Sequence, residues 1–245
     1  MEVLEGKTTK VALESNVKYE REATDLTARK YTALREKFVK TVNMATKRSI
    51  DIIGGMVGVI MLVPITVCVF IANKFAKDSG PIFYTQERIG KNGKKFKMYK
   101  YRSMVVDADE KLEQYLAENE EARLEYEINK KLKDDPRVTK IGKFIRKTSI
   151  DEFPQFINVL KGEMSLVGPR PYLPKEKEEM GEYYKYIIQS KPGVTGMWQV
   201  NGRSEVTFQD RLEMDYKYYN NKGLKQDINL LIKTIMKVAK KEGAV

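Results

Sequence analysis

The sequence contains no histidine and only one cysteine among its 245 residues. Without histidine the chain has no Ser-His-Asp triad, no histidine general base and no imidazole ligand for a metal. The single cysteine, Cys68, excludes an internal disulfide, and zinc is not expected because its usual thiolate and imidazole ligands are nearly absent. Acids, bases and nucleophiles must therefore come mainly from Asp, Glu, Lys, Tyr, Ser or Thr. A metal bound by their oxygens would be a hard cation such as Mg²⁺.

Negative charge is also scarce, since 34 acidic residues oppose 45 Lys and Arg and leave a formal net charge of +11. This balance predicts an anionic partner, which is nucleic acid, anionic lipid or a phosphorylated substrate. Nucleic acid is the weakest of the three because the sequence has no recognisable reader motif. The length and a hydrophobic content of 42% suit one good-sized folded domain with appendages.

The first 45 residues lack a long apolar run, so they do not have the layout of a signal peptide. They are polar and charged, and their apolar residues follow a weak helical spacing through Leu26, Tyr31, Leu34 and Phe38. We expect a helical leader over residues 1–45 that lies along a surface, with a solvated tail as the alternative. A homodimer formed through this helix is a further open alternative.

A charge-free apolar run follows at residues 52–73 and is long enough to enter a membrane. Pro64 lies near its middle, where a proline removes a backbone hydrogen bond and bends or breaks a helix. Both flanks are basic, which favours both ends on the cytoplasmic side. Residues 52–63 would extend only ~18 Å as a helix, about half of a ~30 Å hydrocarbon core. We therefore predict a re-entrant helix hairpin at residues 46–77, broken at Pro64, in preference to a straight span or a buried core helix.

The rest of the chain alternates between strand-like, helical and loop-rich patterns. The expected elements are a β-hairpin at 81–88 and 95–102, an exposed charged helix or helix pair at 107–133, a Gly- and Pro-punctuated region at 134–203, and helices at 207–220 and 225–240. The last helix is amphipathic, so it packs on the core or lies on a membrane surface. We expect a mostly helical α+β fold. In it, the re-entrant hairpin and amphipathic interfacial helices accompany a cytosolic catalytic core at 78–245 with a small β-hairpin or sheet.

The sharpest chemical signal is the run Ser149-Ile150-Asp151-Glu152-Phe153-Pro154-Gln155. Because proline fits in the first turn of a helix, we expect a helix to begin near Ile150. Asp151 and Glu152 would then lie at its positive end, where carboxylates stay ionised. A structural capping box formed by Ser149 and Glu152 is the alternative. Adjacent ionised carboxylates also suit a Mg²⁺ site, and one of them can act as a nucleophile on phosphorus.

Other patterns suggest contacts with phosphate. Arg170 stands between two prolines, and a guanidinium held rigidly there can grip a phosphate through two parallel hydrogen bonds; a solvated surface turn is the alternative. Lys100 and Arg102 share one face of the expected hairpin and suit a diphosphate. The glycine-containing loop at 191–196, which leads to Gln199, permits exposed amides that meet an anion, although such loops are common.

These residues stand in six motifs whose order resembles that of a known family. The motifs are Lys47-Arg48-Ser49-Ile50-Asp51, Phe96-Lys97-Met98-Tyr99-Lys100-Tyr101-Arg102-Ser103-Met104, Asp135-Pro136-Arg137-Val138-Thr139, Asp151-Glu152-Phe153-Pro154-Gln155, Ser165-Leu166-Val167-Gly168-Pro169-Arg170-Pro171 and Lys191-Pro192-Gly193-Val194-Thr195-Gly196. From Lys47 to about Val238 the chain resembles the bacterial sugar transferases, the monotopic polyprenyl-phosphate phosphoglycosyl transferases that initiate surface-glycan assembly. It is similar to undecaprenyl-phosphate galactose and glucose phosphotransferases and looks like the short form of the family.

The resemblance implies a specific reaction. Asp151 would attack the diphosphate of a UDP-sugar, release UMP and carry a covalent phosphosugar, which undecaprenyl phosphate then accepts. Glu152 would help to hold Mg²⁺ or assist proton handling, so that Asp151 and Glu152 form the implied metal site. The positions implied in substrate binding are Lys100, Arg102, Arg137, Arg170, Gln199, Arg203, Asp210 and Arg211. The stretch Gly168–Glu176 favours glucose or galactose as the sugar.

The resemblance also implies a location at the bacterial inner membrane, in contact with its lipids, with the catalytic domain on the cytosolic face. Family members often have Ser before the proline that breaks the re-entrant helix, but here that residue is Val63, so a side-chain hydrogen bond to the freed backbone is missing. Two alternatives stay open. One is a transferase that works by direct attack, with Asp151 or Glu152 only as a metal ligand. The other is a non-catalytic membrane-anchored scaffold or lipid binder.

Overall fold

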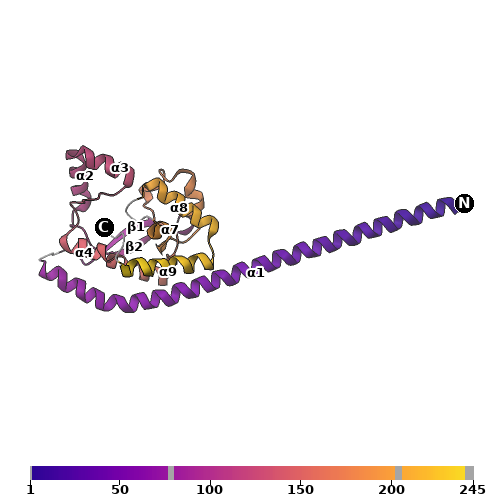
Figure 1. Ribbon diagram of the computed structural model, residues 1–245, viewed down its shortest axis with the longest axis horizontal. Coiled ribbons are helices and arrows are strands. Elements are labelled where there is room, and N and C mark those ends of the chain that lie inside the picture. The colour runs from indigo at the N-terminus through magenta and orange to yellow at the C-terminus, as the bar shows by residue number, and fades with distance from the viewer. Residues whose placement is uncertain (1, 77–79, 202–205, 241–245) are drawn as a thin grey trace. The chain divides into compact units, whose positions relative to one another are not determined.

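The computed structural model describes the backbone of residues 2–76, 80–201 and 206–240, and side chains within these ranges from residue 29 onward. The chain divides into two units, residues 1–47 and 48–245. The first unit is the N-terminal part of one long helix, α1 (Glu2–Phe75), so the leader is helical as predicted. The second unit contains the rest of α1 and the other helices and strands described (Figure 1).

Helix α1 continues through Pro64, so the predicted break at this residue is not present in the structure. Figure 1 shows this part of α1 as one ribbon that curves without interruption. The Thr66 hydroxyl donates to the carbonyl of Leu62 at 2.7 Å, and the Tyr101 hydroxyl lies 3.4 Å from the same carbonyl. The carbonyl that Pro64 leaves without its backbone donor is that of Ile60, four residues earlier, so these bonds to Leu62 do not replace the lost one.

Two charged residues dock α1 on the rest of the second unit. The guanidinium of Arg48 donates to the carbonyls of Val159 and Leu160, at 2.7 and 2.8 Å, near the C-terminal end of α5 (Gln155–Lys161). Carbonyls at a helix end lack partners within the helix, and a cation there also interacts favourably with the helix dipole. The buried Asp51 carboxylate accepts from the Ser165 hydroxyl and the Leu166 amide, both at 2.9 Å.

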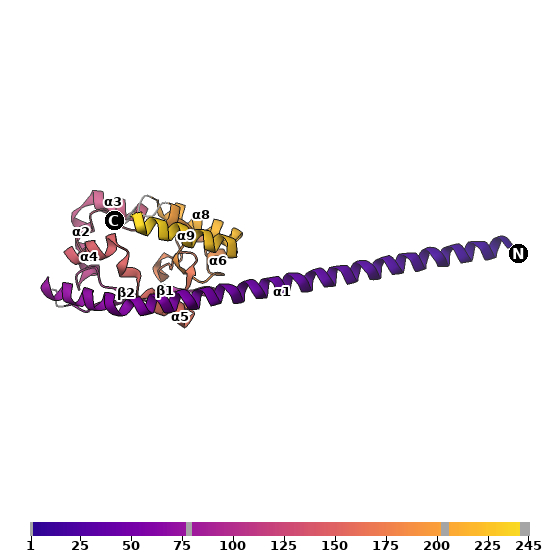
Figure 2. The ribbon, with the colours of Figure 1, turned by 60° about the horizontal axis from the view of Figure 1, so that its bottom comes forward.

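Glycines on α1 allow it to approach α5 closely, and Figure 2 shows the two helices side by side. A Cβ atom added to Gly58 would lie 2.2 Å from the ring of Phe156, and one on Gly55 would lie 2.8 Å from a methyl group of Leu160. The other side of α1 is apolar and open, with Ile60 and Val63 exposed at 72% and 67%. By length and composition α1 is able to cross a membrane, and only 22% of its most apolar stretch is buried.

The close approach at Gly58 makes a testable prediction. Gly58→Ala is expected to lower the free energy of unfolding by about 1–3 kcal/mol, because the added methyl forces Phe156 and α5 away. Thermal unfolding in detergent measures the change. Gly223→Ala is the matched control, since a Cβ there meets nothing within 4 Å. Equal melting temperatures for the two variants would contradict the packing described.

The predicted β-hairpin is confirmed. Strands β1 (Phe83–Ile89) and β2 (Lys95–Tyr101) pair antiparallel, with Phe83 opposite Tyr101 and Ile89 opposite Lys95. The structure adds a second sheet that the sequence did not predict, in which β3 (Ser165–Val167) and β4 (Gly193–Thr195) pair in parallel. The mostly helical fold with a small sheet therefore agrees with the prediction, whereas the cytosolic placement of its core stays a prediction.

The remaining helices surround these strands and largely follow the expected segments. They are α2 (Ala108–Glu118), α3 (Glu120–Asn129), α4 (Lys140–Lys147), α6 (Tyr184–Ile187), α7 (Met197–Asn201), α8 (Phe208–Asn221) and α9 (Leu224–Lys240), with short 3₁₀ turns η1 (Lys91–Gly93), η2 (Ile150–Glu152), η3 (Pro174–Glu176) and η4 (Gly181–Tyr183). Helices α2 and α3 are the charged pair expected at 107–133. Helices α8 and α9 are those expected at 207–220 and 225–240.

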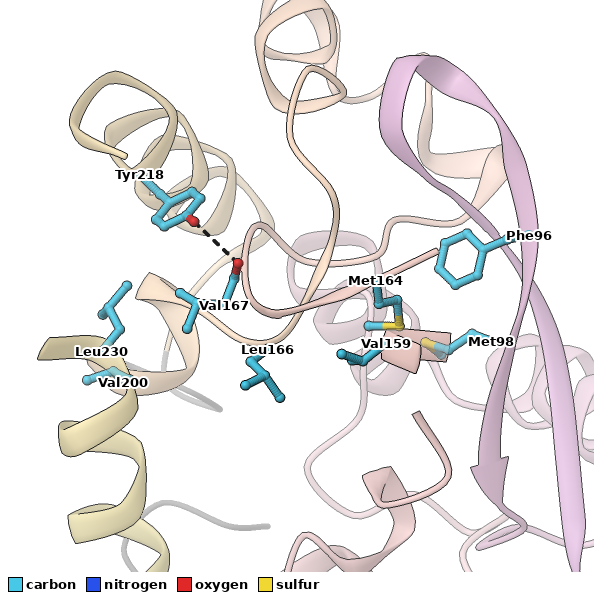
Figure 3. Close-up of a cluster of buried hydrophobic side chains, with 9 residues drawn as sticks. All are labelled: Phe96, Met98, Val159, Met164, Leu166, Val167, Val200, Tyr218 and Leu230. Carbon is cyan, nitrogen blue, oxygen red and sulfur yellow. Dashed lines mark hydrogen bonds between the residues drawn. The ribbon is translucent and has the colours of Figure 1, made fainter. Parts of the chain in front are cut away.

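One apolar cluster ties the hairpin to the C-terminal helices (Figure 3). Its buried members come from β2, α5, the residue before β3, β3 itself, α7, α8 and α9, and they are Phe96, Met98, Val159, Met164, Leu166, Val167, Val200, Tyr218 and Leu230. The Tyr218 hydroxyl donates to the Val167 carbonyl at 3.3 Å. Because α5 is packed into this cluster, the turn at residues 150–152 that precedes it is held in place.

Candidate active site

The Asp151–Glu152 pair lies in the turn η2, between α4 and α5. A 3₁₀ turn occupies the position where the sequence predicted a helix start, and the α-helix itself begins at Gln155, directly after Pro154. Ser149 has a positive φ of 56° and its side chain makes no capping hydrogen bond. The alternative of a Ser149–Glu152 capping box is therefore wrong.

Lys100 joins the two carboxylates. Its ammonium nitrogen on β2 lies 3.0 Å from Oε1 of Glu152 and 3.8 Å from Oδ2 of Asp151. Burial is the main cause that raises the pKa of Asp151 to about 6; the charge of Lys100 opposes this rise and that of Glu152 contributes to it. Asp151 lies in a 3₁₀ turn, so the predicted α-helix end is not what sets its charge. Asp151 is mostly buried, and desolvation is the largest influence on its charge.

The carboxylates of Asp151 and Glu152 fit a Mg²⁺ ion. Their oxygens already converge on one cation, the ammonium of Lys100, so their geometry permits a shared positive charge. Within the described ranges no group of three acidic or cysteine side chains is placed to bind a metal. Mg²⁺ commonly takes one or two carboxylates and completes its ligands with water and substrate phosphates, and this donor set agrees with that habit.

Arg146 also belongs to this group, although the sequence reasoning did not select it. It lies in the last turn of α4 and donates from Nε to the Ser103 hydroxyl at 2.8 Å. Burial lowers its pKa, while the charges of Asp151 and Glu152 act in the opposite direction. In sequence it resembles an ordinary cation at a helix C-terminus, and only the fold places it near the carboxylates.

A second cationic group gathers around Trp198. The guanidinium carbon of Arg170 lies 5.4 Å from the Trp198 ring centroid, and that of Arg211 lies 5.9 Å from it. Arg88 of β1 is buried and donates to the Pro171 carbonyl at 3.0 Å. Burial and the nearby Arg170 charge lower the pKa of Arg88, and likewise that of Arg211, to about 10. Three guanidinium groups therefore share a desolvated space.

Several polar atoms of this group are buried without a hydrogen-bond partner among the described residues. They are Nε of Arg88, Nε of Arg170, Nε1 of Trp198, Oε1 of Gln199 and Oδ1 of Asp215. Buried polar groups are seldom left unpaired in native proteins, and each exception calls for a cause. A polar, anionic ligand that accepts from the donors and donates to the oxygens would account for all of them.

Asp215 holds the Arg170 segment in place and was not selected from the sequence. It is completely buried on α8, and Oδ2 accepts from the Arg170 amide at 2.9 Å and the Tyr172 hydroxyl at 2.8 Å. Burial raises its pKa to about 7, against the effect of these hydrogen bonds and of Arg170 and Arg211. Its spacing from Leu212 and Tyr218 puts it on the buried face of α8, which is a signal the sequence contains.

The raised pKa of Asp215 predicts a pH dependence of stability. Between about pH 4 and pH 7 the folded chain binds a proton at Asp215 that the unfolded chain has released, so the free energy of unfolding falls as pH rises through this window. The contribution is up to about 4 kcal/mol. Melting temperatures from pH 5 to pH 8 should fall less steeply in Asp215→Asn than in the unaltered chain. Parallel curves would contradict the assignment.

Arg88 is influenced by both groups of charged residues. The charges that shift its pKa include that of Arg170 from one group and that of Glu152 from the other. One end of the site thus holds two carboxylates with Lys100, and the other holds the arginines around Trp198. Of the predicted substrate-binding residues, the structure brings Arg170 and Arg211 together at this second end, where Gln199 follows Trp198 in sequence, and it places Lys100 at the first.

Three further predicted residues are engaged in the fold. Arg102 is buried and donates to the carbonyls of Pro81 and Met104, at 2.6 and 2.9 Å. Arg137 forms a double contact with Asp135 at 2.7 and 2.8 Å. The exposed Asp210 caps α8 by bonding to Thr207. Their contact with substrate stays a prediction, and the predicted Arg203 lies outside the described residues.

Comparison with known proteins shows which proteins the chain resembles. Residues 42–241 match the model of the family described as bacterial sugar transferase. An undecaprenyl-phosphate galactose phosphotransferase of Salmonella typhimurium is 42% identical over 211 residues, which cover 86% of this chain and 44% of that protein. The exopolysaccharide production protein ExoY of Rhizobium meliloti is 38% identical over 206 residues, covering 84% and 91% of the two chains.

A more distant relative, the UDP-glucose:undecaprenyl-phosphate glucose-1-phosphate transferase of Escherichia coli, is 36% identical over 204 residues, or 80% of this chain and 40% of that one. The chain spans less than half the length of several of the curated relatives it matches, including the Salmonella protein. The family match nevertheless covers most of the present chain, including both ends of the site. The chain belongs to the bacterial sugar transferase family.

Proposed function

We propose that this chain transfers a hexose-1-phosphate from UDP-glucose or UDP-galactose to undecaprenyl phosphate and releases UMP, as the first step of surface polysaccharide assembly. The observation that carries the proposal is the two-ended site, with carboxylates at one end and an arginine cluster with unpaired donors at the other. A nucleoside diphosphate sugar has the matching chemistry, because its phosphates are anionic and its base and sugar carry polar groups. The names of the galactose and glucose phosphotransferase relatives support the same reaction.

The reaction proceeds in two displacements at phosphorus. A carboxylate oxygen of Asp151 attacks the phosphorus that bears the sugar, and the bond from that phosphorus to the bridging oxygen breaks, so UMP leaves with the electron pair. A phosphate oxygen of undecaprenyl phosphate then attacks the same phosphorus and frees the Asp151 carboxylate. Two displacements let donor and acceptor use one small site in turn. The turn η2 contains one pair of adjacent acids, which agrees with a single site that donor and acceptor use in turn.

The side chains around Asp151 prepare it for this role. Lys100 holds both carboxylates and, with Arg146, adds positive charge where the transferred phosphoryl group must lie. Asp151 and Glu152 would hold Mg²⁺, whose charge offsets that of the diphosphate. At the other end, Arg170, Arg88 and Arg211 would bind the phosphate of the leaving nucleotide, as guanidinium groups do through paired donors.

The apolar surface of the second unit suits a chain whose acceptor has a long hydrocarbon tail. From Arg48 to Phe75, α1 keeps one face against the other elements and exposes an apolar face. Helix α9 also exposes apolar side chains, among them Ile232 and Ile235. We infer that this unit rests on the inner membrane from the cytosolic side, where UDP-sugars are made, with lipid contacts along the open face of α1.

A donor panel tests the proposal. The purified chain is mixed with undecaprenyl phosphate, Mg²⁺ and one of several UDP-sugars, and UMP is measured. UMP release confined to UDP-glucose or UDP-galactose is the expected result. No release with any donor would overturn the proposed function and favour a membrane-anchored scaffold or lipid binder. Release only when the acceptor is present, with no labelled phosphosugar on the protein, would favour direct attack over the covalent route.

A further inference from the structure

The charge of α1 changes sign along its length, before the apolar segment begins. Residues 1–28 contain six acidic and four basic residues, whereas residues 29–47 contain six basic residues and one acidic residue, Glu36. The basic part therefore lies next in sequence to the charge-free run at 52–73. Side chains are described for this part, and those from Arg29 to Thr46 are exposed.

An apolar stripe accompanies the basic residues. Tyr31, Leu34, Phe38 and Val42 are spaced by three or four residues, so on a helix they share one face. They are large and open to solvent, with Tyr31 71% exposed and Phe38 70% exposed. The same spacing continues in the sequence through Ala45 and into the apolar run. Lone exposed apolar residues need no cause, but a periodic row of them does.

We propose that residues 29–47 form a helix that lies in the headgroup layer of an anionic bilayer. A helix with aromatic and aliphatic residues on one face and Lys and Arg around the rest is the pattern that binds such a surface in its plane. Basic residues beside a membrane segment are attracted by anionic lipid. Each Lys or Arg near the surface raises the partition constant into the membrane roughly fivefold. This interaction is separate from the proposed catalytic function and does not depend on it.

Charge argues against a second copy of the chain as the occupant of this stripe. Helices that pair through an apolar seam are usually joined by opposite charges on its flanks. Here Arg35 and Lys40 have a single acidic residue, Glu36, in the same 19-residue segment, so paired copies would bring like charges together. An anionic bilayer surface pairs its headgroups with the cations and takes up the apolar stripe at the same time.

Site-directed spin labelling of the full chain tests the proposal. Cys68 is the only cysteine, so Cys68→Ser gives a background in which Phe38→Cys, on the stripe, or Ala33→Cys, on the opposite face, carries the only label. The chain is reconstituted in vesicles of equal parts phosphatidylglycerol and phosphatidylcholine, or of phosphatidylcholine alone. Accessibility to oxygen and to a water-soluble nickel reagent gives the depth of each label. The run at 52–73 carries the same Cys68→Ser change in every sample, so differences between the samples are local to residues 29–47.

We expect the label at position 38 to enter the lipid in anionic vesicles and the label at position 33 to stay in water. Replacing Lys30, Arg35, Lys37 and Lys40 by Gln should return label 38 to water, with a more than tenfold rise in its nickel accessibility, while UMP release in detergent is unchanged. Equal water exposure of label 38 in both kinds of vesicle would overturn the proposal. Short distances between labels on two chains, with no lipid contact, would also overturn it and assign the stripe to a second copy.

Discussion

Asp151→Asn is expected to lower UMP release by on the order of a thousandfold or more and to abolish the phosphosugar adduct on the protein. The amide keeps the shape of the side chain but offers no anionic oxygen to attack phosphorus. Asp151 itself is buried and lies 3.8 Å from the ammonium of Lys100. Incubation with a donor labelled in the phosphate next to the sugar, followed by denaturation, detects the adduct.

Two comparisons make the Asp151 experiment specific. Glu113→Gln, on the exposed α2 helix, removes one negative charge far along the chain from the turn and should leave UMP release unchanged. Glu152→Gln should slow the reaction and weaken its dependence on Mg²⁺, yet an adduct should still form on Asp151. Rapid UMP release by Asp151→Asn in the absence of acceptor would rule out Asp151 as the nucleophile.

Arg170→Met is expected to raise the KM for the UDP-sugar by roughly tenfold to a hundredfold, with a smaller effect on kcat. A charge-assisted hydrogen bond contributes about 1.5–3 kcal/mol, which corresponds to that range. Methionine keeps an unbranched stem near Trp198, and the backbone amide at this position still donates to Asp215. The variant thus removes the guanidinium while it retains the hydrogen bond that holds the segment.

Steady-state kinetics at saturating undecaprenyl phosphate measure the change, and melting temperature reports on folding. Arg123→Met is the matched control, because Arg123 lies half-exposed on α3 and pairs only with glutamates of the same helix among the contacts described. It should leave KM unaltered. An Arg170→Met enzyme with unaltered KM and a normal melting temperature would remove Arg170 from the nucleotide end of the site.

Local patterns were sufficient for the hairpin and the charged helices. Apolar and cationic residues alternate along β2, and the turn before it contains Asn92 and Gly93, whose positive φ angles of 57° and 77° suit these residue types. The register follows from that turn. The parallel pair β3 and β4 escaped prediction because each strand has only three residues, too few to show a period.

At Pro64 the structure departs from a local rule, because α1 continues through this residue. A proline in the middle of a helical run predicts a break, and the sequence gives no sign that one is avoided. Tyr101, on a strand distant in sequence, lies 2.6 Å from the Thr66 hydroxyl, and both reach toward the Leu62 carbonyl. These contacts fasten the turn after Pro64 to β2, although they do not replace the hydrogen bond to the Ile60 carbonyl that Pro64 removes.

The sequence by itself determined the family, the long apolar run, the hairpin and the adjacent carboxylates Asp151 and Glu152, because each depends on residue order or on spacing over a few residues. Only the tertiary structure decided that Arg88, Arg146 and Asp215 belong to the same site. Their roles depend on which distant segments surround them and on how much water those segments exclude, and burial is what moves their pKa values. Spacing along a chain does not contain that information, since desolvation is a property of the assembled fold.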